Sequence, residues 1–271
     1  MVDPVFRLDL YRGTARAYEQ FRPPYPADVM ADVAERTGAD GTGRLLDLAC
    51  GTGQVAFPLA DRFAEIWAVD QEPGMIEVAR HKAADAGGGA RFRFLTCAAE
   101  RLTAPTGHFD LITVGNAFHR LPRTPLARQM LRWLRPGGYV ALLWGGSPMY
   151  GDAPWQRTLA ATMQRWQDRP GAEPRVPASY QADRDERSDR RILAEAGFEL
   201  SGRYSFPVSH VWTADELAGF VASTSVLSAA ALGERAGEFD ADLRRKLADC
   251  QRDGRFSQQT EIAYDLARKP G

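Results

Sequence analysis

The stretch LLDLACGTGQ, residues 45–54, decides the fold of this 271-residue chain. Its first half is a short apolar run typical of a buried strand, and its second half is a turn punctuated by Gly51 and Gly53. Glycine has no Cβ, so the chain can take up positive φ and its backbone N–H groups can approach a ligand closely. A helical pattern, interrupted early by Pro58, follows over residues 54–62, and a helix N-terminus adds unpaired N–H groups. The pattern predicts a strand–turn–helix unit that binds a polar, elongated small molecule.

Two classes of ligand fit this turn. Residues 51–56, GTGQVA, match the dinucleotide pattern G-x-G-x-x-G/A, and Asp70 follows the next apolar run as a ribose-binding carboxylate would. Asp47, however, stands four residues before Gly51, where its charge would repel a pyrophosphate and attract an ammonium group. S-adenosylmethionine (SAM) has an α-amino group and a sulfonium but no phosphate. We therefore expect SAM, with NAD as the alternative.

The sequence DLACGTG, residues 47–53, resembles motif I of the class I SAM-dependent methyltransferases, and further matches follow in the expected order. The resemblance implies that SAM is the cofactor and S-adenosylhomocysteine (SAH) the product. It also implies that Asp70 accepts from the ribose hydroxyls and that Gln71 and Met75 flank the adenine. The cofactor residues expected in the core are Asp47, Ala49, Gly51, Gly53, Asp70, Gln71, Met75, Ala99, Glu100 and Asn116.

One position departs from the family pattern. Family members often show Gly-Asp-Ala-Glu where this chain has CAAE at residues 97–100, so Ala98 replaces the carboxylate that often holds the adenine amino group. The contact to adenine must then come from the backbone, from Glu100 or from water.

The N-terminal residues predict two helices on either side of the proline-rich residues 22–26. Pro26 suits the start of the second helix, and Gly38 suits its end. The spacing Ala-x-x-Tyr-x-x-x-Arg-Pro over residues 15–23 resembles a helical lid in which Tyr18 and Arg22 face the methionine carboxylate. A guanidinium can bind a carboxylate bidentately. The alternative is a solvated amphipathic helix with an aromatic stripe in the core.

Apolar runs alternate with helical patterns through most of the chain. They predict an α/β fold: a Rossmann-like, doubly wound, mostly parallel seven-stranded sheet with an antiparallel last strand, an N-terminal helical lid and a helical cap insertion. We expect a single domain. Its parts are a lid at 1–40, a SAM-binding core at 41–145, cap segments at 146–190 and 213–250, and the remaining sheet at 191–212 and 251–271. The charge run at 183–191 is expected to be a solvated face or a mobile loop.

Two histidines are candidates for a general base. His119 follows the strand at 109–114, near the place where the transferred methyl group should lie, and His210 lies on or near a strand that faces the cap. An unperturbed imidazole has a pKa of about 6.5, suited to proton transfer at neutral pH. The alternative for His119 is packing or a hydrogen bond within its loop. No cluster of Asp, Glu and His has the spacing of a metal site, so we expect no metal.

Composition limits the partners and the location of the chain. The 34 basic and 35 acidic residues give a formal net charge of -1, which predicts neither a nucleic-acid nor a membrane partner. The N-terminus is too charged for a signal peptide, and no run approaches the length of a membrane span. Three widely separated cysteines predict no disulfide framework. We expect a cytoplasmic protein with a small-molecule substrate.

These patterns predict a SAM-dependent methyltransferase that acts on a hydroxyl or amino group of a small molecule, such as a secondary metabolite. Two alternatives stay open. A protein of this fold can bind SAM without transferring the methyl group, either to assist a rearrangement or as a binding module. Methylation of RNA or protein is the other, although residues 116–119 read NAFH rather than the Asn-Pro-Pro-Tyr type of sequence used on amino groups of bases or glutamine.

Overall fold

The computed structural model describes residues 3–86, 90–251 and 253–271. Its centre is one seven-stranded sheet with the strand order β3-β2-β1-β4-β5-β7-β6. Only β7 runs antiparallel to its neighbours β5 and β6, which confirms the predicted fold class. The strands are β1 (Arg44–Leu48), β2 (Glu65–Asp70), β3 (Arg91–Thr96), β4 (Phe109–Gly115), β5 (Leu134–Gly145), β6 (Glu199–Thr213) and β7 (Arg255–Arg268).

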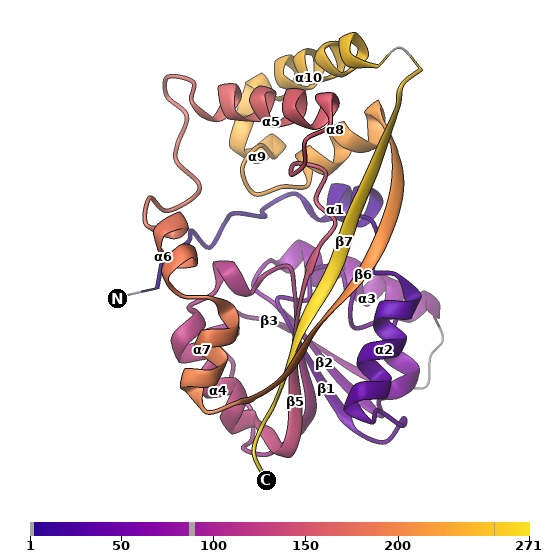
Figure 1. The fold of residues 1–271 in the computed structure, drawn as a ribbon, viewed down its shortest axis with the longest axis vertical. Coiled ribbons are helices and arrows are strands. Elements are labelled where there is room, and N and C mark those ends of the chain that lie inside the picture. The colour runs from indigo at the N-terminus through magenta and orange to yellow at the C-terminus, as the bar shows by residue number, and fades with distance from the viewer. Residues whose placement is uncertain (1–2, 87–89, 252) are drawn as a thin grey trace.

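Helices cover both faces of the sheet, as a buried parallel sheet requires. Alternate residues of β1 point to opposite faces: Leu46 packs in the cluster that holds α4 and α7, whereas Leu45 packs with α2. Figure 1 shows these two helical layers on either side of the strands. The helices are α1 (Ala15–Phe21), α2 (Ala27–Thr37), α3 (Pro73–Ala86), α4 (Arg123–Trp133), α5 (Pro154–Gln167), α6 (Tyr180–Glu186), α7 (Asp189–Ala196), α8 (Ala214–Ala222), α9 (Ala229–Leu232) and α10 (Ala236–Cys250).

A helical cap stands above the carboxyl end of the central strands. The long strands β6 and β7 extend past the sheet and carry this cap, as Figure 1 shows. Trp212 and Phe256 are paired across the extension and are buried with side chains of α5, α8 and α10 in a separate hydrophobic cluster. The cap therefore has its own core, and Thr213 begins α8 with the capping box that the sequence predicts.

The N-terminal segment lies between the cap and the sheet (Figure 1). Its Asp3 accepts a hydrogen bond from the backbone N–H of Thr124 at 3.0 Å and pairs with Arg187 at 2.6 Å. The following helix, α1, packs on α8 so closely that a Cβ on Gly219 would lie 2.3 Å from the Phe21 ring. The predicted second helix ends at Gly38 with a φ of 67°. This segment is therefore attached both to the cap and to the body of the domain.

Two local predictions are wrong. The helix expected over residues 54–62 is a series of hydrogen-bonded turns followed by a short 3-10 helix, Ala60–Arg62, because Pro58 has no N–H to continue an α-helix. The charge run at 183–191 is not wholly solvated. Its Asp183 and Asp189 pair at 2.5 and 2.6 Å with Arg123, whose side chain is only 1% exposed. Burial of that guanidinium requires such partners.

Within the described residues, no helix is both long and apolar enough to cross a membrane.

Candidate active site

Two cavities meet at the carboxyl edge of the sheet. The edge cavity, about 500 Å³, is lined by the ends of β1, β2 and β4 and by the N-terminal segment. The cap cavity, about 390 Å³, extends from the same edge to α5 and α8. Ligands of open α/β sheets bind outside the carboxyl ends of the strands, so both cavities lie where the fold favours a site. Both are lined by Tyr11, Tyr18, Ala49, Gly115, Asn116 and Arg120.

The backbone is strained at the junction of the two cavities. Ala49 and Asn116 each have a φ of 50°, and among the described residues they are the only non-glycine residues with positive φ. Ala49 follows β1 and Asn116 follows β4, two adjacent strands of the sheet. Such conformations cost about 1–3 kcal/mol each and cluster at functional sites. The strain therefore marks the same edge as the cavities do.

Asp47 is a buried carboxylate without a charged partner. Its side chain, 1% exposed, lines the cap cavity and accepts a hydrogen bond from the Thr113 hydroxyl at 2.8 Å through Oδ1. Its Oδ2 is buried with no hydrogen-bond partner among the described residues. Burial raises the pKa of Asp47 to about 7. An unpaired buried carboxylate favours a cationic partner, and an ammonium group supplies both charge and donors.

Asp70 holds the glycine turn together. Its Oδ2 accepts from the backbone N–H of Gly51 and its Oδ1 from that of Glu72, each at 2.8 Å. Burial raises its pKa. A carboxylate oxygen accepts more than one hydrogen bond, so both oxygens can still accept from hydroxyls in the edge cavity, which Asp70 lines.

The two glycines of the turn have different tasks. Gly51 has a φ of 55° and lines the edge cavity, and a Cβ there would lie 3.5 Å from the Tyr18 ring. Gly53 has a φ of 86° and lines neither cavity; a Cβ there would lie 2.3 Å from the Phe57 ring. Gly53 therefore shapes the turn, and only Gly51 is placed to approach a ligand.

The other core residues expected at the cofactor lie around the edge cavity. Gln71 and Met75 line it from the end of β2 and the first turn of α3, and Met75 is buried. Ala99 and Glu100 line it from the segment after β3. Asn116 lies at the junction, where its amide donates to the carbonyl of Gly145 at 3.4 Å. The edge cavity thus brings together residues from the N-terminal segment and from the segments that follow β1, β2, β3 and β4.

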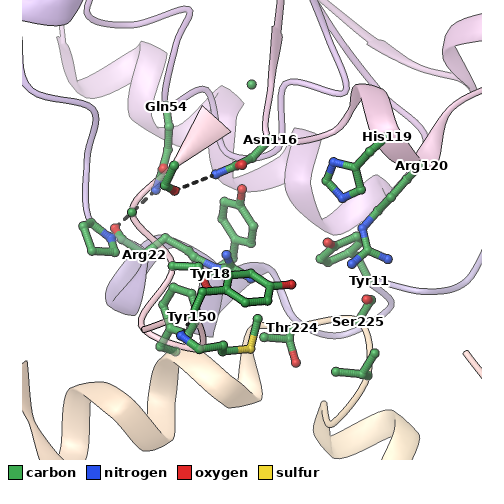
Figure 2. Close-up of a pocket in the computed structure, with 18 of the residues that line it drawn as sticks. Tyr11, Tyr18, Arg22, Gln54, Asn116, His119, Arg120, Tyr150, Thr224 and Ser225 are labelled. Atoms are coloured by element: carbon green, nitrogen blue, oxygen red, sulfur yellow. Dashed lines mark hydrogen bonds between the residues drawn. The ribbon is translucent and has the colours of Figure 1, made fainter. Parts of the chain in front are cut away.

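Arg22 lines the cap cavity but is already engaged. Its Nε donates to the Ser223 hydroxyl at 2.8 Å, and its guanidinium lies over the rings of Tyr18 and Phe220, at 5.0 and 4.2 Å from their centroids. Figure 2 shows Tyr18 and Arg22 beside Gln54, whose amide donates to the Arg22 carbonyl. Arg22 thus connects the lid with the cap and retains further N–H donors for a ligand.

The two candidate histidines differ in position. His119 lines the cap cavity, and burial, assisted by the positive charge of Arg120, lowers its pKa to about 3. It is neutral at physiological pH, which makes it a good hydrogen-bond acceptor and a weak base. His210 lines neither cavity, and its ring is tilted against that of Trp212 of the cap with ring centroids 4.2 Å apart. The structure therefore does not bring His210 together with the other candidate site residues.

Several lining residues belong to no motif in the sequence. Tyr11, Tyr180 and Ser225 come from segments with no motif, and Arg120 follows His119 without belonging to a motif itself. Of these residues, only Arg120 has a signal in the sequence, because it follows the same strand as Asn116 and His119. The other three reach the cavity through tertiary packing. No group of three or more potential metal ligands occurs in the described part of the chain.

Comparisons with known proteins agree with this geometry. A family profile described as a methyltransferase domain matches residues 45–138. The ubiquinone/menaquinone biosynthesis C-methyltransferase UbiE of Azotobacter vinelandii is 34% identical over 113 residues, which cover 40% of this chain and 45% of that protein. The demethylmenaquinone methyltransferase of Thermus thermophilus is 32% identical over 166 residues, 58% of this chain and 74% of that protein.

A solved structure shows how far the fold extends. The [4+2]-cyclase SpnF matches with a TM-score of 0.56 at 20% identity, covering 100% of this chain and 98% of SpnF. At that identity the likeness concerns the fold alone. The sequence relatives show the family: the chain belongs to the class I SAM-dependent methyltransferases. The aligned segment spans about half the length of the Azotobacter relative.

Proposed function

We propose that this chain transfers a methyl group from SAM to a small molecule held under the cap. The observation that carries the proposal is the unpaired Asp47 carboxylate, buried at a cavity that continues into a second, adenosine-sized cavity. SAM, when bound, supplies an electrophilic methyl group. What the chain supplies is binding, orientation and exclusion of water, which are the main requirements of such a transfer.

The residues fit this cofactor at each end. In the edge cavity Asp70 would hold the ribose, with Gln71, Met75, Ala99 and Glu100 around the adenine. At the cap cavity Asp47 would pair with the ammonium group, and Tyr18 and Arg22 would face the carboxylate. Ala49, Gly51 and Asn116 would lie along the molecule between these ends. The turn shaped by Gly53 would set the approach of the backbone.

The cap cavity supports a small-molecule acceptor. Beyond the residues assigned to SAM, its wall comes largely from the cap and is apolar or uncharged apart from Arg120; it includes Met163 and Gln164 of α5 and Phe220 of α8. A cavity closed by helices suits a compact acceptor better than a nucleic acid, and the net charge of -1 gives no attraction to phosphates. Hydroxyl and amino groups are the acceptors that we expect, and the C-methyltransferases among the relatives add carbon as a third.

His119 acts in this proposal by hydrogen bonding. Its neutral ring lines the cap cavity next to Arg120, so it can accept from a hydroxyl or amino group of the acceptor and orient it. A base with a pKa of about 3 is too weak to deprotonate a hydroxyl group effectively at neutral pH. The proton therefore leaves mainly to solvent, and His119 is a positioning residue.

The test is a parallel calorimetric titration of the purified chain with SAM, SAH and NAD. Micromolar binding of SAM and SAH without NAD binding is the expected result, and binding of NAD alone would overturn the proposal. Incubation with SAM and a panel of phenols, amines and enols should then release SAH. If the chain binds SAM, releases no SAH with any acceptor and still converts another compound, it is a SAM-dependent protein that does not transfer the methyl group.

A further inference from the structure

Arg120 is a cation without a partner at the junction of the two cavities. It ends the short 3-10 helix Phe118–Arg120, which follows β4, and it lines both cavities. Its Nε and Nη1 are buried with no hydrogen-bond acceptor, and no described residue forms an ion pair with it. The guanidinium is held between the rings of Phe6 and Tyr11, 5.6 and 5.7 Å from their centroids. Arg120 as a whole is only partly buried, but a guanidinium whose buried N–H groups lack an acceptor in the protein favours an anion in the site.

A second unpaired group lies on the same side of the cavity. The hydroxyl of Ser225, which is fully buried, has no hydrogen-bond partner among the described residues, and Ser225 lines the cap cavity. Its carbonyl is fixed by Arg175, whose Nε donates to it at 2.5 Å. Figure 2 shows Ser225, Tyr11 and Arg120 on one side of the cavity, away from Gln54 and Arg22 on the other.

Few of the residues that line the cap cavity are charged. Of the described residues that line it, those with formal charge are Arg22, Asp47 and Arg120. The proposed function uses Asp47 for the ammonium group and Arg22 for the carboxylate of SAM. Arg120 is left over, beside the neutral His119. We propose that Arg120 and Ser225 form a subsite for the ionised hydroxyl of the methyl acceptor, which is a phenol or an enol bound as its oxyanion.

The walls of the cavity support this class of acceptor. The lining of the cap cavity includes the rings of Tyr11, Tyr150, Tyr180 and Phe220, and the rings of His119 and Tyr180, next to Arg120, lie 6.1 Å apart. Flat aromatic walls suit a planar, conjugated acceptor. A guanidinium near its oxygen favours the ionised form, and the hydroxyl proton passes to solvent on binding. The anion is more nucleophilic than the neutral hydroxyl, so binding at this subsite would prepare the acceptor for methylation.

The inference rests on the proposed function and can be tested with 4-nitrophenol, whose ionised form is coloured. The chain is loaded with SAH and titrated with 4-nitrophenol at a pH slightly below the pKa of the free phenol. We expect bound 4-nitrophenol to be ionised and its neutral methyl ether, 4-nitroanisole, to bind at least tenfold more weakly. Arg120→Met should weaken 4-nitrophenolate binding about 10- to 100-fold, the loss expected for a charge-assisted hydrogen bond.

Three variants make the test specific. Arg120→Lys should restore part of both the affinity and the colour change, and Ser225→Ala should weaken binding about 3- to 10-fold. Arg128→Met, on the exposed face of α4, is the matched control and should change neither. SAH affinity should stay within about twofold in all of these variants. Folding of each is checked by its SAH affinity, because the cofactor residues are unchanged.

The overturning results are equally specific. The inference fails if 4-nitrophenol does not bind, binds in its neutral form, or binds equally to the Arg120→Met variant. It also fails if that variant loses SAH affinity instead, because Arg120 would then belong to the cofactor carboxylate. Preferred binding of 4-nitrobenzoate would assign the subsite to carboxylates. If the unmodified chain binds no SAH at all, it is the proposed function that fails.

Discussion

The edge cavity and the cap cavity share six lining residues, yet they are built in different ways. The edge cavity takes its polar groups from the ends of neighbouring parallel strands, so Gly51, Asp70 and Glu100 reach it through the sheet register itself. The cap cavity is closed by α5, α8 and the N-terminal segment, which lie outside the sheet; α5 and α8 pack through the hydrophobic cluster of the cap. A site at strand ends is fixed by backbone pairing, whereas a site under a cap depends on side-chain packing.

Loosening the cap should have the largest effect. Leu243 of α10 is fully buried in the cap cluster, so Leu243→Ala should lower the free energy of unfolding by about 2–5 kcal/mol. Denaturant titration measures this change, and the half-exposed Leu200 supplies the control Leu200→Ala, which should cost far less. If the two cavities differ as described, acceptor turnover should fall much further than SAH affinity does. An equal loss of both would mean that the cap also fixes the cofactor edge.

Removing the ribose carboxylate should act on the edge cavity alone. Asp70→Ala removes an acceptor of the Gly51 and Glu72 backbone N–H groups together with the proposed ribose contacts, so SAM binding should weaken by about 1–3 kcal/mol. Calorimetry measures this loss of SAM affinity. Asp110→Ala, at the opposite end of the sheet where Asp110 caps the Arg44 backbone N–H, is the matched control and should leave SAM affinity unchanged. Unchanged affinity in the Asp70 variant would contradict the adenosine placement.

Asp47 should make stability and binding respond to pH in opposite directions. Its pKa rises from 3.8 to about 7 on folding, so between these values the folded chain holds a proton that the unfolded chain has lost. Stability should therefore fall as the pH rises from about 4 to about 7, and Asp47→Asn should be more stable than the parent at pH 8 but not at pH 4.

The same carboxylate should govern SAM affinity. Because only ionised Asp47 attracts an ammonium group, affinity should rise by up to about tenfold per pH unit between about pH 5.5 and 7. Asp47→Asn should abolish that rise while Asp110→Asn retains it. Thermal melts at several pH values measure the stability, and calorimetry at the same pH values measures the SAM affinity. A pH-independent affinity in the parent chain would show that Asp47 does not contact the ammonium group.

His119 should have the smallest effect. As a neutral hydrogen-bond acceptor it should contribute about 0.5–1.5 kcal/mol, so His119→Ala should lower turnover about 2- to 10-fold and leave SAM affinity nearly intact. Because its pKa is about 3, the pH profile of kcat should show no step near 6.5 that His119→Ala removes. Such a step would identify His119 as a general base, and undiminished turnover would remove it from the site.

The sequence by itself determined the sheet and the cofactor edge. The apolar strand followed by the glycine turn, the acidic residue after β2 and the capping box at Thr213 are local patterns, and each has a direct backbone consequence. Parallel strands place their carboxyl ends at one edge, so the glycine turn after β1 and Asp70 at the end of β2 are expected at the same edge. The pattern also predicts Gly53 at the ligand, whereas in the structure Gly53 lines neither cavity and a Cβ there would lie 2.3 Å from the Phe57 ring.

The tertiary structure alone decided the cap cavity and the electrostatics. Whether His119 is a base or a neutral acceptor depends on its burial beside Arg120, and whether Asp183 is solvated depends on its contact with Arg123 of a distant helix. Ser225 and Tyr11 come to one wall from opposite ends of the chain. Local sequence fixes backbone conformation through hydrogen bonding and sterics, whereas desolvation and long-range pairing depend on which segments pack against one another.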